Sequence, residues 1–193
     1  RVTVADIAQR VEAAFVAVPR SGHLPESQQG YAALDRALPI GHGQTNSQPT
    51  TVRHMLVALD PQPGHRVLDV GSGSGWTTAL VAHLVGPDGW VLGLERVPEL
   101  VAFGRACLDR RSMPWARIER ASTEVLGAPE RAPFDRILVS AMAPEIPAEL
   151  IAQLGPGGIL VVPAGGRLWR VTAEGAASSL GRYVFVPLML PGG

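Results

Sequence analysis

One segment of the chain combines a short apolar strand, a glycine-rich turn and the start of a helix. Residues 67–70 read Val-Leu-Asp-Val, Gly71-Ser-Gly-Ser-Gly75 follows directly, and a helical pattern begins at Trp76. Glycines let backbone amides approach a ligand closely at a helix N-terminus, although an isolated turn of this kind also occurs as a plain strand-to-helix connection. The segment constrains the chain to a fold in which a buried strand feeds a helix, with a binding loop between them.

The glycine spacing and the next acidic residue narrow the ligand class. A dinucleotide-binding fingerprint needs its third glycine one position later, where this chain has Trp76, so an oxidoreductase is disfavoured. Glu95 ends the following apolar run, 24 residues after Gly71, where a carboxylate can accept hydrogen bonds from ribose hydroxyls. Alternatively, Glu95 is a solvated charge at the end of a strand, without a ligand. Asp69 lies beneath the loop, where it either orients amides, receives a cationic ligand group or caps the turn.

Apolar strands and helical patterns alternate along most of the chain. The expected strands are 66–70, 90–95, 116–119, 135–140 and 159–162, and the expected helices between and beside them are 76–85, 98–110 and 147–154. Two further strand-like runs, 168–172 and 183–186, have no convincing helix between them. This pattern predicts an α/β fold, a doubly wound, mostly parallel, Rossmann-like sheet with an antiparallel C-terminal edge.

The N-terminal part is organised differently. Apolar residues from Val4 to Val18 recur at helical spacing until Pro19, and a second helix is expected from Pro49 to about Asp60. Residues 20–48 between them are rich in Gly, Pro, Ser and Gln, which is typical of a functional lid or binding segment. At 193 residues we expect one domain, 1–193, with N-terminal helices and a substrate segment over 1–60 and a ligand-binding α/β core over 61–193.

Composition excludes several chemistries. All 17 basic residues are arginine, so a Schiff base, a pyridoxal phosphate anchor and a phosphate-loop lysine are impossible. Cys107 is the only cysteine, and the five histidines show no metal-ligand spacing, so neither a disulfide nor a metal site is expected. The 17 acidic residues balance the basic ones, and no apolar run approaches the roughly 18 residues needed to cross a bilayer. We expect a cytoplasmic monomer without nucleic-acid or membrane partners.

Several segments together resemble one enzyme family over nearly the whole chain. They are residues 38–49 (Leu-Pro-Ile-Gly-His-Gly-Gln-Thr-Asn-Ser-Gln-Pro), 67–75, 95–100, 132–135, 143–147, 156–158, 162–166 and 185–188. With these motifs the chain resembles a class I S-adenosylmethionine-dependent methyltransferase, and specifically the protein-L-isoaspartate O-methyltransferase family. The glycine loop is common to many methyltransferases, whereas the Gly-Gln-Thr-x-Ser segment is distinctive of this one.

The resemblance implies specific roles for individual residues. Thr45 and Ser47 would be catalytic, with the Ser47 hydroxyl contacting the substrate carboxylate; without the resemblance, a helix cap before Pro49 would be the preferred interpretation of these residues. The implied donor site consists of Gln44, Asp69, Gly71, Ser72, Gly73, Gly75, Glu95, Arg96, Ser122 and Thr123. The implied substrate contacts are Ser47, Ser140, Ala141, Met142 and Val186, the last within an edge strand that could pair with an extended peptide.

The chain departs from the family at one motif. The family's Gly-Asp-Gly, whose aspartate serves the adenine side of the donor site, is replaced here by Ala121-Ser-Thr-Glu124. Losing a charge-assisted hydrogen bond costs about 1.5–3 kcal/mol unless Ser122, Thr123 or Glu124 replaces it. Donor affinity and substrate are therefore the properties that this departure affects.

The predicted activity is methyl transfer from S-adenosylmethionine to the carboxylate of an L-isoaspartyl residue in a peptide or protein, yielding S-adenosylhomocysteine and serving protein repair. A carboxylate with a pKa of about 4 is ionised at neutral pH, so the reaction needs no general base and no metal. One alternative is a divergent member that methylates a normal aspartate in a peptide-tailoring pathway. Another is a non-catalytic protein that binds S-adenosylmethionine.

Overall fold

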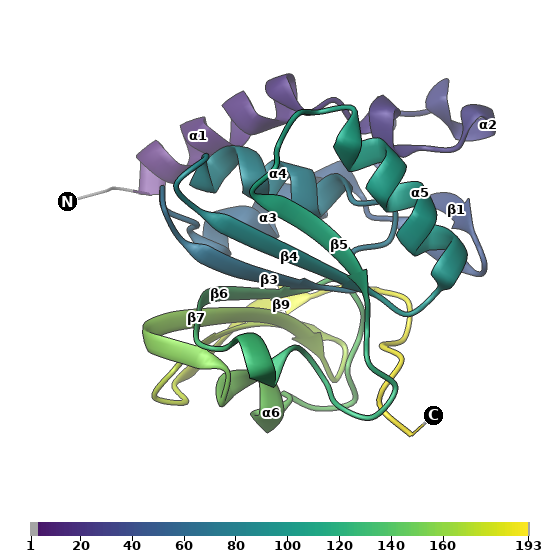
Figure 1. Cartoon of the computed structure of the whole chain (residues 1–193). Coiled ribbons are helices and arrows are strands. Elements are labelled where there is room, and N and C mark those ends of the chain that lie inside the picture. Colours follow the sequence, from purple (N-terminus) through teal and green to yellow (C-terminus); the bar gives the residue numbers. More distant parts are fainter. Residues whose placement is uncertain (1–3, 193) are drawn as a thin grey trace.

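The computed structural model describes residues 4–192. A central sheet is flanked by helices (Figure 1). In chain order the helices and strands are α1 (Val4–Ala17), η1 (Arg20–His23), α2 (Glu26–Gln29), β1 (Leu38–Gly41), β2 (Gln44–Asn46), α3 (Pro49–Leu59), β3 (Arg66–Val70), α4 (Trp76–Val85), β4 (Trp90–Glu95), α5 (Pro98–Asp109), β5 (Ala116–Arg120), η2 (Pro129–Arg131), β6 (Phe134–Val139), α6 (Ala148–Ile151), β7 (Leu154–Ala164), β8 (Arg167–Thr172) and β9 (Ala177–Arg182).

The main sheet has seven strands in the order β5-β4-β3-β6-β7-β8-β9. The first five in this order pair in parallel, and β8 and β9 add antiparallel neighbours at one edge. The chain runs outward from β3 to β5 and then returns to place β6 on the other side of β3. This reversal creates a switch point at the carboxyl ends of β3 and β6, where open sheets bind ligands. The predicted mostly parallel fold with an antiparallel C-terminal edge is confirmed.

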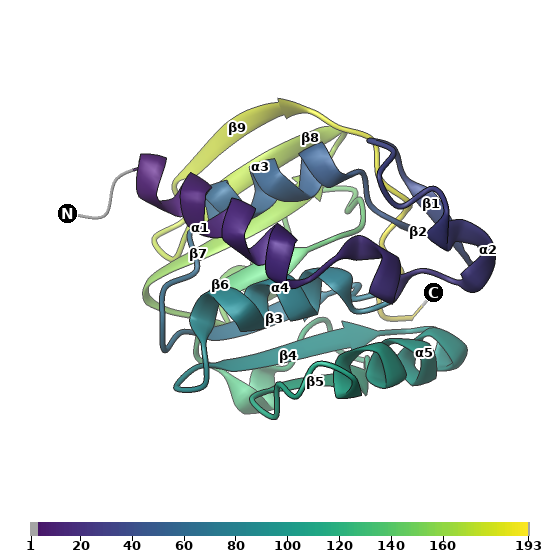
Figure 2. The ribbon, with the colours of Figure 1, turned by 90° about the horizontal axis from the view of Figure 1, so that it is seen from above.

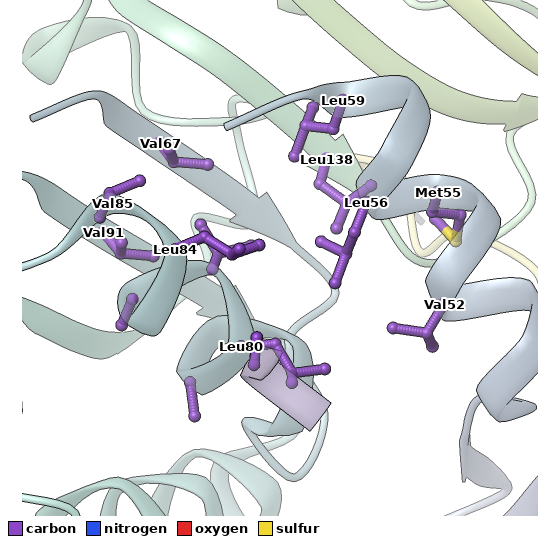
Figure 3. Packing of buried hydrophobic residues seen from close by; sticks show 14 of the residues in the cluster. Val52, Met55, Leu56, Leu59, Val67, Leu80, Leu84, Val85, Val91 and Leu138 are labelled. Atoms are coloured by element: carbon purple, nitrogen blue, oxygen red, sulfur yellow. The ribbon is translucent and has the colours of Figure 1, made fainter. Parts of the chain in front are cut away.

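One face of the sheet is covered by α3 and α4, and α1 packs across the outer side of these two helices (Figure 2). The core beneath them is formed by Leu56 and Leu59 of α3, Leu80 and Leu84 of α4, and strand residues such as Val67 (Figure 3). Helix α4 is buried on almost every side because α1 covers its outer surface. A helix that lies between the sheet and another helix needs apolar residues on all sides, which explains the nearly continuous apolar sequence of α4.

The opposite face is covered by shorter elements. Helix α6 packs against β7, and the rings of Trp90 and Phe134 stack with centroids 6.3 Å apart. Leu150 of α6 is fully buried, together with alternating residues of the strands such as Leu68 and Ile137. Cys107, in helix α5, is buried.

Three sequence predictions need correction. The predicted helix over 147–154 forms only over Ala148–Ile151, because β7 already begins at Leu154 and extends the predicted strand 159–162 in both directions. Residues 20–48 are not one long loop, because they contain η1, α2 and the β1–β2 hairpin. The tail strand predicted over 183–186 is wrong.

The edge strand is β9, Ala177–Arg182, which pairs with β8 after a tight turn at Gly175. Apart from Leu180, its residues are small or polar, so it lacks the alternating apolar pattern by which strands are recognised. Residues 183–188 instead leave the sheet and reach a single bridge between Met142 and Pro187. Among residues 4–192, the structure contains no helix that is long and apolar enough to cross a membrane.

Candidate active site

A cleft opens at the carboxyl ends of β3, β4 and β6, at the switch point of the sheet. Its walls come from the glycine loop, the ends of these strands, the β2 segment and the C-terminal tail. The lining residues are Gln44, Thr45, Val70, Gly71, Gly73, Leu94, Glu95, Arg96, Ala121, Ser122, Val125, Leu126, Gly127, Ser140, Ala141, Val186, Leu188, Met189 and Pro191. We call it the donor cleft.

The glycine loop is shaped by its backbone and held by the neighbouring strand. Gly71, Gly73 and Gly75 all have positive φ (80°, 52° and 79°), a region that side chains other than glycine rarely adopt. The amides of Gly71 and Ser72 donate to the Leu94 carbonyl of β4, at 2.8 and 3.0 Å. The loop therefore lets a ligand approach its backbone closely. Two of its amides are not free for a ligand, because their hydrogen bonds to Leu94 fix the shape of the loop.

Glu95 ends β4 beside the loop and is 6% exposed. Its Oε2 accepts a hydrogen bond from the Gly73 amide at 2.9 Å, and its Oε1 accepts one from the Val97 amide at 2.9 Å. A carboxylate has about four acceptor positions, so two remain for further donors. Because Glu95 also lines the donor cleft, it can accept hydrogen bonds from a ligand while it holds the loop.

Asp69 is fully buried beneath the loop and is not part of the cleft wall. Its Oδ2 accepts a hydrogen bond from the Thr78 hydroxyl at 2.7 Å, whereas Oδ1 has no hydrogen-bond partner among residues 4–192. Burial raises the pKa of Asp69 to about 7; the Thr78 hydrogen bond opposes this rise and the charge of Glu95 adds to it. Asp69 therefore lies below the loop, where it is hydrogen-bonded to Thr78 of α4 and not to a loop amide.

A second, smaller cleft adjoins the first and contains the predicted catalytic segment. It is lined by Thr45, Asn46, Ser47, Gly71, Ser72, Gly73, Ser74, Trp76, Thr77 and Ser140. We call it the substrate cleft. Thr45, Gly71, Gly73 and Ser140 line both clefts, so the two spaces share a wall.

The C-terminal tail reaches this site through the turn after β6. The Met142 amide donates to the Val186 carbonyl at 2.7 Å, and the Leu188 amide donates to the Met142 carbonyl at 2.8 Å. These bonds place Val186 and Leu188 in the wall of the donor cleft. Met142 itself does not line the cleft, and its sulfur accepts a hydrogen bond from the Gly166 amide.

The segment that departs from the family motif forms a compact turn. Ser122 Oγ accepts hydrogen bonds from the amides of Glu124 and Val125 at 3.0 and 3.2 Å. Ser122 lines the donor cleft, whereas Thr123 does not and instead accepts a hydrogen bond from the Gly192 amide through its carbonyl. Arg96 also lines the cleft and donates to the Ser122 carbonyl at 3.4 Å.

Most predicted site residues therefore meet at the two clefts. Asp69, Gly75, Thr123 and Met142 line neither cleft. Sequence reasoning missed several wall residues, among them Leu94, Val125, Leu126, Gly127, Leu188, Met189 and Pro191 of the donor cleft. The strand-end position of Leu94 was available as a signal, but the tail residues come to the site only through tertiary contacts.

The donor cleft has the chemistry that S-adenosylmethionine requires. A carboxylate at the end of β4 suits ribose hydroxyls, and the apolar side chains of Val125, Leu126 and Leu188 suit a flat purine ring. Glycines at the loop allow the ligand to lie against the backbone. Within residues 4–192, no three His, Cys, Asp or Glu side chains are grouped so that they could hold a metal ion.

Comparisons with known proteins agree with this geometry. The sequence model of the family described as protein-L-isoaspartate(D-aspartate) O-methyltransferase matches residues 4–188. The protein-L-isoaspartate O-methyltransferase of Methanopyrus kandleri is 45% identical over 188 residues, which cover 93% of this chain and 83% of the relative. That of Aeropyrum pernix is 47% identical over 163 residues, 81% of this chain and 60% of the relative.

Two solved structures share this fold. A Plasmodium falciparum protein assigned to the protein-L-isoaspartate O-methyltransferases, crystallised with S-adenosyl-L-homocysteine, has a TM-score of 0.79 and 27% identity, covering 93% of this chain and 89% of that one. Another protein-L-isoaspartate O-methyltransferase structure, 23% identical, matches the fold with a TM-score of 0.85, covering 95% of this chain and 62% of that one. The chain belongs to the protein-L-isoaspartate(D-aspartate) O-methyltransferase family.

Proposed function

We propose that this enzyme transfers a methyl group from S-adenosylmethionine to the carboxylate of an L-isoaspartyl residue in a peptide or protein. The observation that carries the proposal is the shared wall between the donor cleft, which contains Glu95, and the substrate cleft, which contains Ser47. Thr45 and Ser140 stand at the junction. Because the two clefts adjoin along these residues, a donor bound in one cleft and an acceptor bound in the other would lie next to each other, without bulk water between them.

The residues around the junction have to bind and align rather than move protons. The substrate carboxylate is already ionised at neutral pH, and Ser47, Thr45 and Ser140 offer neutral hydroxyls to hold it. A neutral donor orients the carboxylate while leaving its charge available for attack, which a buried arginine would quench. When bound, S-adenosylmethionine supplies the methyl group on a sulfonium centre whose leaving group is a neutral thioether.

The protein's contribution to the rate is then positioning and exclusion of water. The glycine loop supports the donor side, Glu95 orients the ribose, and the tail residues Val186 and Leu188 close the wall. The substrate's own backbone amide nitrogen, on the residue that follows, then attacks the ester carbonyl and loses its proton. Methanol is released and a succinimide forms, because an alkoxide leaves far more readily than the oxide of a free carboxylate. Hydrolysis of the succinimide regenerates some normal aspartate, which is a repair reaction.

We further propose that the protein acts as a monomer on free peptides and proteins in the cytoplasm. Both clefts are built from one copy of the chain, and its single cysteine is a buried thiol. Sedimentation at assay concentration tests the oligomeric state.

A methyl-transfer assay with labelled S-adenosylmethionine tests the proposed function. Two peptides that differ only in isoaspartate or aspartate at one position are compared, with the Ser179→Ala variant of the exposed strand β9 as a control protein. We expect transfer to the isoaspartyl peptide alone. Transfer to the aspartyl peptide would establish the peptide-tailoring alternative instead. Transfer to neither, with donor binding intact, would contradict both and favour a non-catalytic binding protein.

A further inference from the structure

Arg20 is a buried arginine whose hydrogen bonds converge on β2 and Ser47, residues 44–47. We call these residues the substrate segment. It follows α1 and is 6% exposed. Its Nε donates to Asn46 Oδ1 at 2.7 Å, and its Nη2 donates to the carbonyls of Asn46 and Ser47 at 3.1 and 2.9 Å. The guanidinium lies over the Trp76 ring, 5.5 Å from its centroid. One buried cation therefore holds both the side chain and the backbone of the β2 end.

The same guanidinium holds a second strip of the chain. Nη1 donates to the Leu34 carbonyl at 3.0 Å, and Nη2 donates to the Arg36 carbonyl at 2.7 Å. Asp35, between these two residues, accepts hydrogen bonds from the Thr50 amide and the Gln48 side chain. The strip 34–36 is thus tied to the start of α3 on one side and to Arg20 on the other.

The acceptors around Arg20 are neutral oxygens, with no carboxylate in hydrogen-bond contact among residues 4–192. Burial lowers the pKa of Arg20 to about 10, and the charge of Asp35 opposes part of this change. Arg20 is therefore still protonated at neutral pH. A buried unpaired charge is costly, and the converging carbonyls offset that cost only while the segment keeps this shape.

Asn46 connects this support to the glycine loop. Its Nδ2 donates to the Ser74 hydroxyl at 3.1 Å. His23, which is fully buried, also contacts Ser74: Arg111 Nε donates to His23 Nε2 at 2.8 Å, so Nδ1 carries the proton and donates to the Ser74 carbonyl at 3.1 Å. The substrate segment and the donor loop therefore share one hydrogen-bonded support, formed by the first turn after α1.

We propose that Arg20 and Asn46 form a positioning unit that sets the place of Ser47 relative to the glycine loop. The inference rests on the proposed function, because it assigns Ser47 the task of holding the substrate carboxylate. Arg20 acts through the Ser47 backbone and does not touch the reacting atoms. Lysine cannot replace it, because one ammonium nitrogen has three donors and cannot span carbonyls on both the 34–36 strip and the 46–47 segment.

Hydrogen exchange tests the positioning without relying on turnover. Arg20→Lys is compared with Arg136→Lys, since Arg136 is also buried and also donates to backbone carbonyls, those of Leu59, Asp60 and Asp135. We expect Arg20→Lys to speed amide exchange over residues 44–47 by about tenfold or more, with core strands unchanged. Arg136→Lys should leave that segment protected. Equal exchange of 44–47 in Arg20→Lys and wild type would overturn the proposal.

Kinetics supply the second test. Arg20→Lys should lower kcat on the isoaspartyl peptide by about 100-fold, the cost of a misplaced reactant, with S-adenosylhomocysteine affinity changed less than about threefold. Adding Asn46→Ala should cause little further loss, because the two residues act as one unit. Retained turnover in Arg20→Lys would refute the positioning role while the proposed function stood.

The proposal can still be tested if the wild-type protein is inactive or if Arg20→Lys does not fold. If wild-type protein methylates neither peptide, the proposed function fails, and the exchange comparison still decides whether Arg20 orders the segment. If Arg20→Lys does not fold, Asn46→Ala alone keeps the guanidinium but removes the bond to Ser74. It should then show the same local exchange and the same loss of kcat, and normal values for both would overturn the proposal.

Discussion

The Glu95 carboxylate, at the end of β4, accepts a hydrogen bond from the Gly73 amide in the loop that follows β3, at 2.9 Å. The proposed ribose-binding acid therefore also holds the donor loop in place. A ligand that hydrogen-bonds to Glu95 meets a carboxylate already oriented by two backbone amides, those of Gly73 and Val97.

Replacing Glu95 with glutamine should weaken S-adenosylhomocysteine binding about 10- to 100-fold. The glutamine side chain has no negative charge to accept hydrogen bonds from the ribose hydroxyls, and its NH₂ group would face a backbone N–H. Together these changes cost about 1.5–3 kcal/mol of binding free energy. Isothermal titration calorimetry measures this change. Glu99→Gln, on the exposed first turn of α5, is the matched control. Unchanged affinity in Glu95→Gln would refute the ribose assignment.

Replacing Ser47 with alanine should lower kcat/KM for the isoaspartyl peptide about 10- to 100-fold. The variant removes the hydroxyl proposed to hold the substrate carboxylate, worth about 1–3 kcal/mol, and leaves the donor cleft intact. Steady-state kinetics and calorimetry with S-adenosylhomocysteine separate the two sites. The Ser179→Ala control should behave as wild type. If donor affinity fell as much as turnover, Ser47 would not be specific to the substrate.

Asp69 should make the protein less stable as pH rises. Its pKa is raised by burial from 3.8 to about 7, so between about pH 4 and 7 the folded state binds more protons than the unfolded state. This contribution to stability is complete below about pH 4 and is lost as pH rises through 7. Asp69→Asn should remove this slope. Denaturant unfolding from pH 4 to 8 measures it, and parallel profiles for the two proteins would contradict the assignment.

His23 should have the opposite effect over nearly the same range. Burial is the main cause that lowers the pKa of His23 from 6.5 to about 4, with Arg111 and Arg110 adding to it and the Ser74 hydrogen bond opposing it. The folded state therefore binds fewer protons between pH 4 and 6.5, and stability is lost as pH falls through that range. His23→Gln should flatten the acid side of the stability profile. A profile that keeps its acid slope would show that His23 does not cause it.

Gly104 of α5 should be required for donor binding although it lies outside both clefts. A Cβ added there would lie 3.1 Å from the Gly73 carbonyl and 2.9 Å from Ile118 Cδ1, so alanine would push the helix away from the donor loop. We expect Gly104→Ala to cost about 1–3 kcal/mol of stability and to weaken S-adenosylhomocysteine binding. Gly30→Ala is the control, because nothing lies within 4 Å of its added Cβ and its φ is −62°. Normal affinity in Gly104→Ala would show that the loop tolerates the displacement.

Local sequence information was sufficient for the strand–loop–helix unit around Gly71. Strand β3, helix α4 and strand β4 have the predicted bounds, because an apolar run, a glycine turn and a helical pattern are each visible within about ten residues. The edge strand was misplaced because the prediction relied on such local patterns, and β9 has none. β9 is a strand because β8 offers it a hydrogen-bonding edge, and its own residues carry no apolar alternation.

The amino-acid sequence by itself determined the α/β class, the position of the donor loop and the acid at the end of the next strand, since these depend on short-range patterns. Only the tertiary structure decided that Arg20, 26 residues before Asn46, holds the substrate segment, and that Leu188 closes the donor cleft. Both depend on contacts between distant parts of the chain. A buried guanidinium takes whichever carbonyls the fold brings within reach, and no periodicity in the sequence encodes that choice.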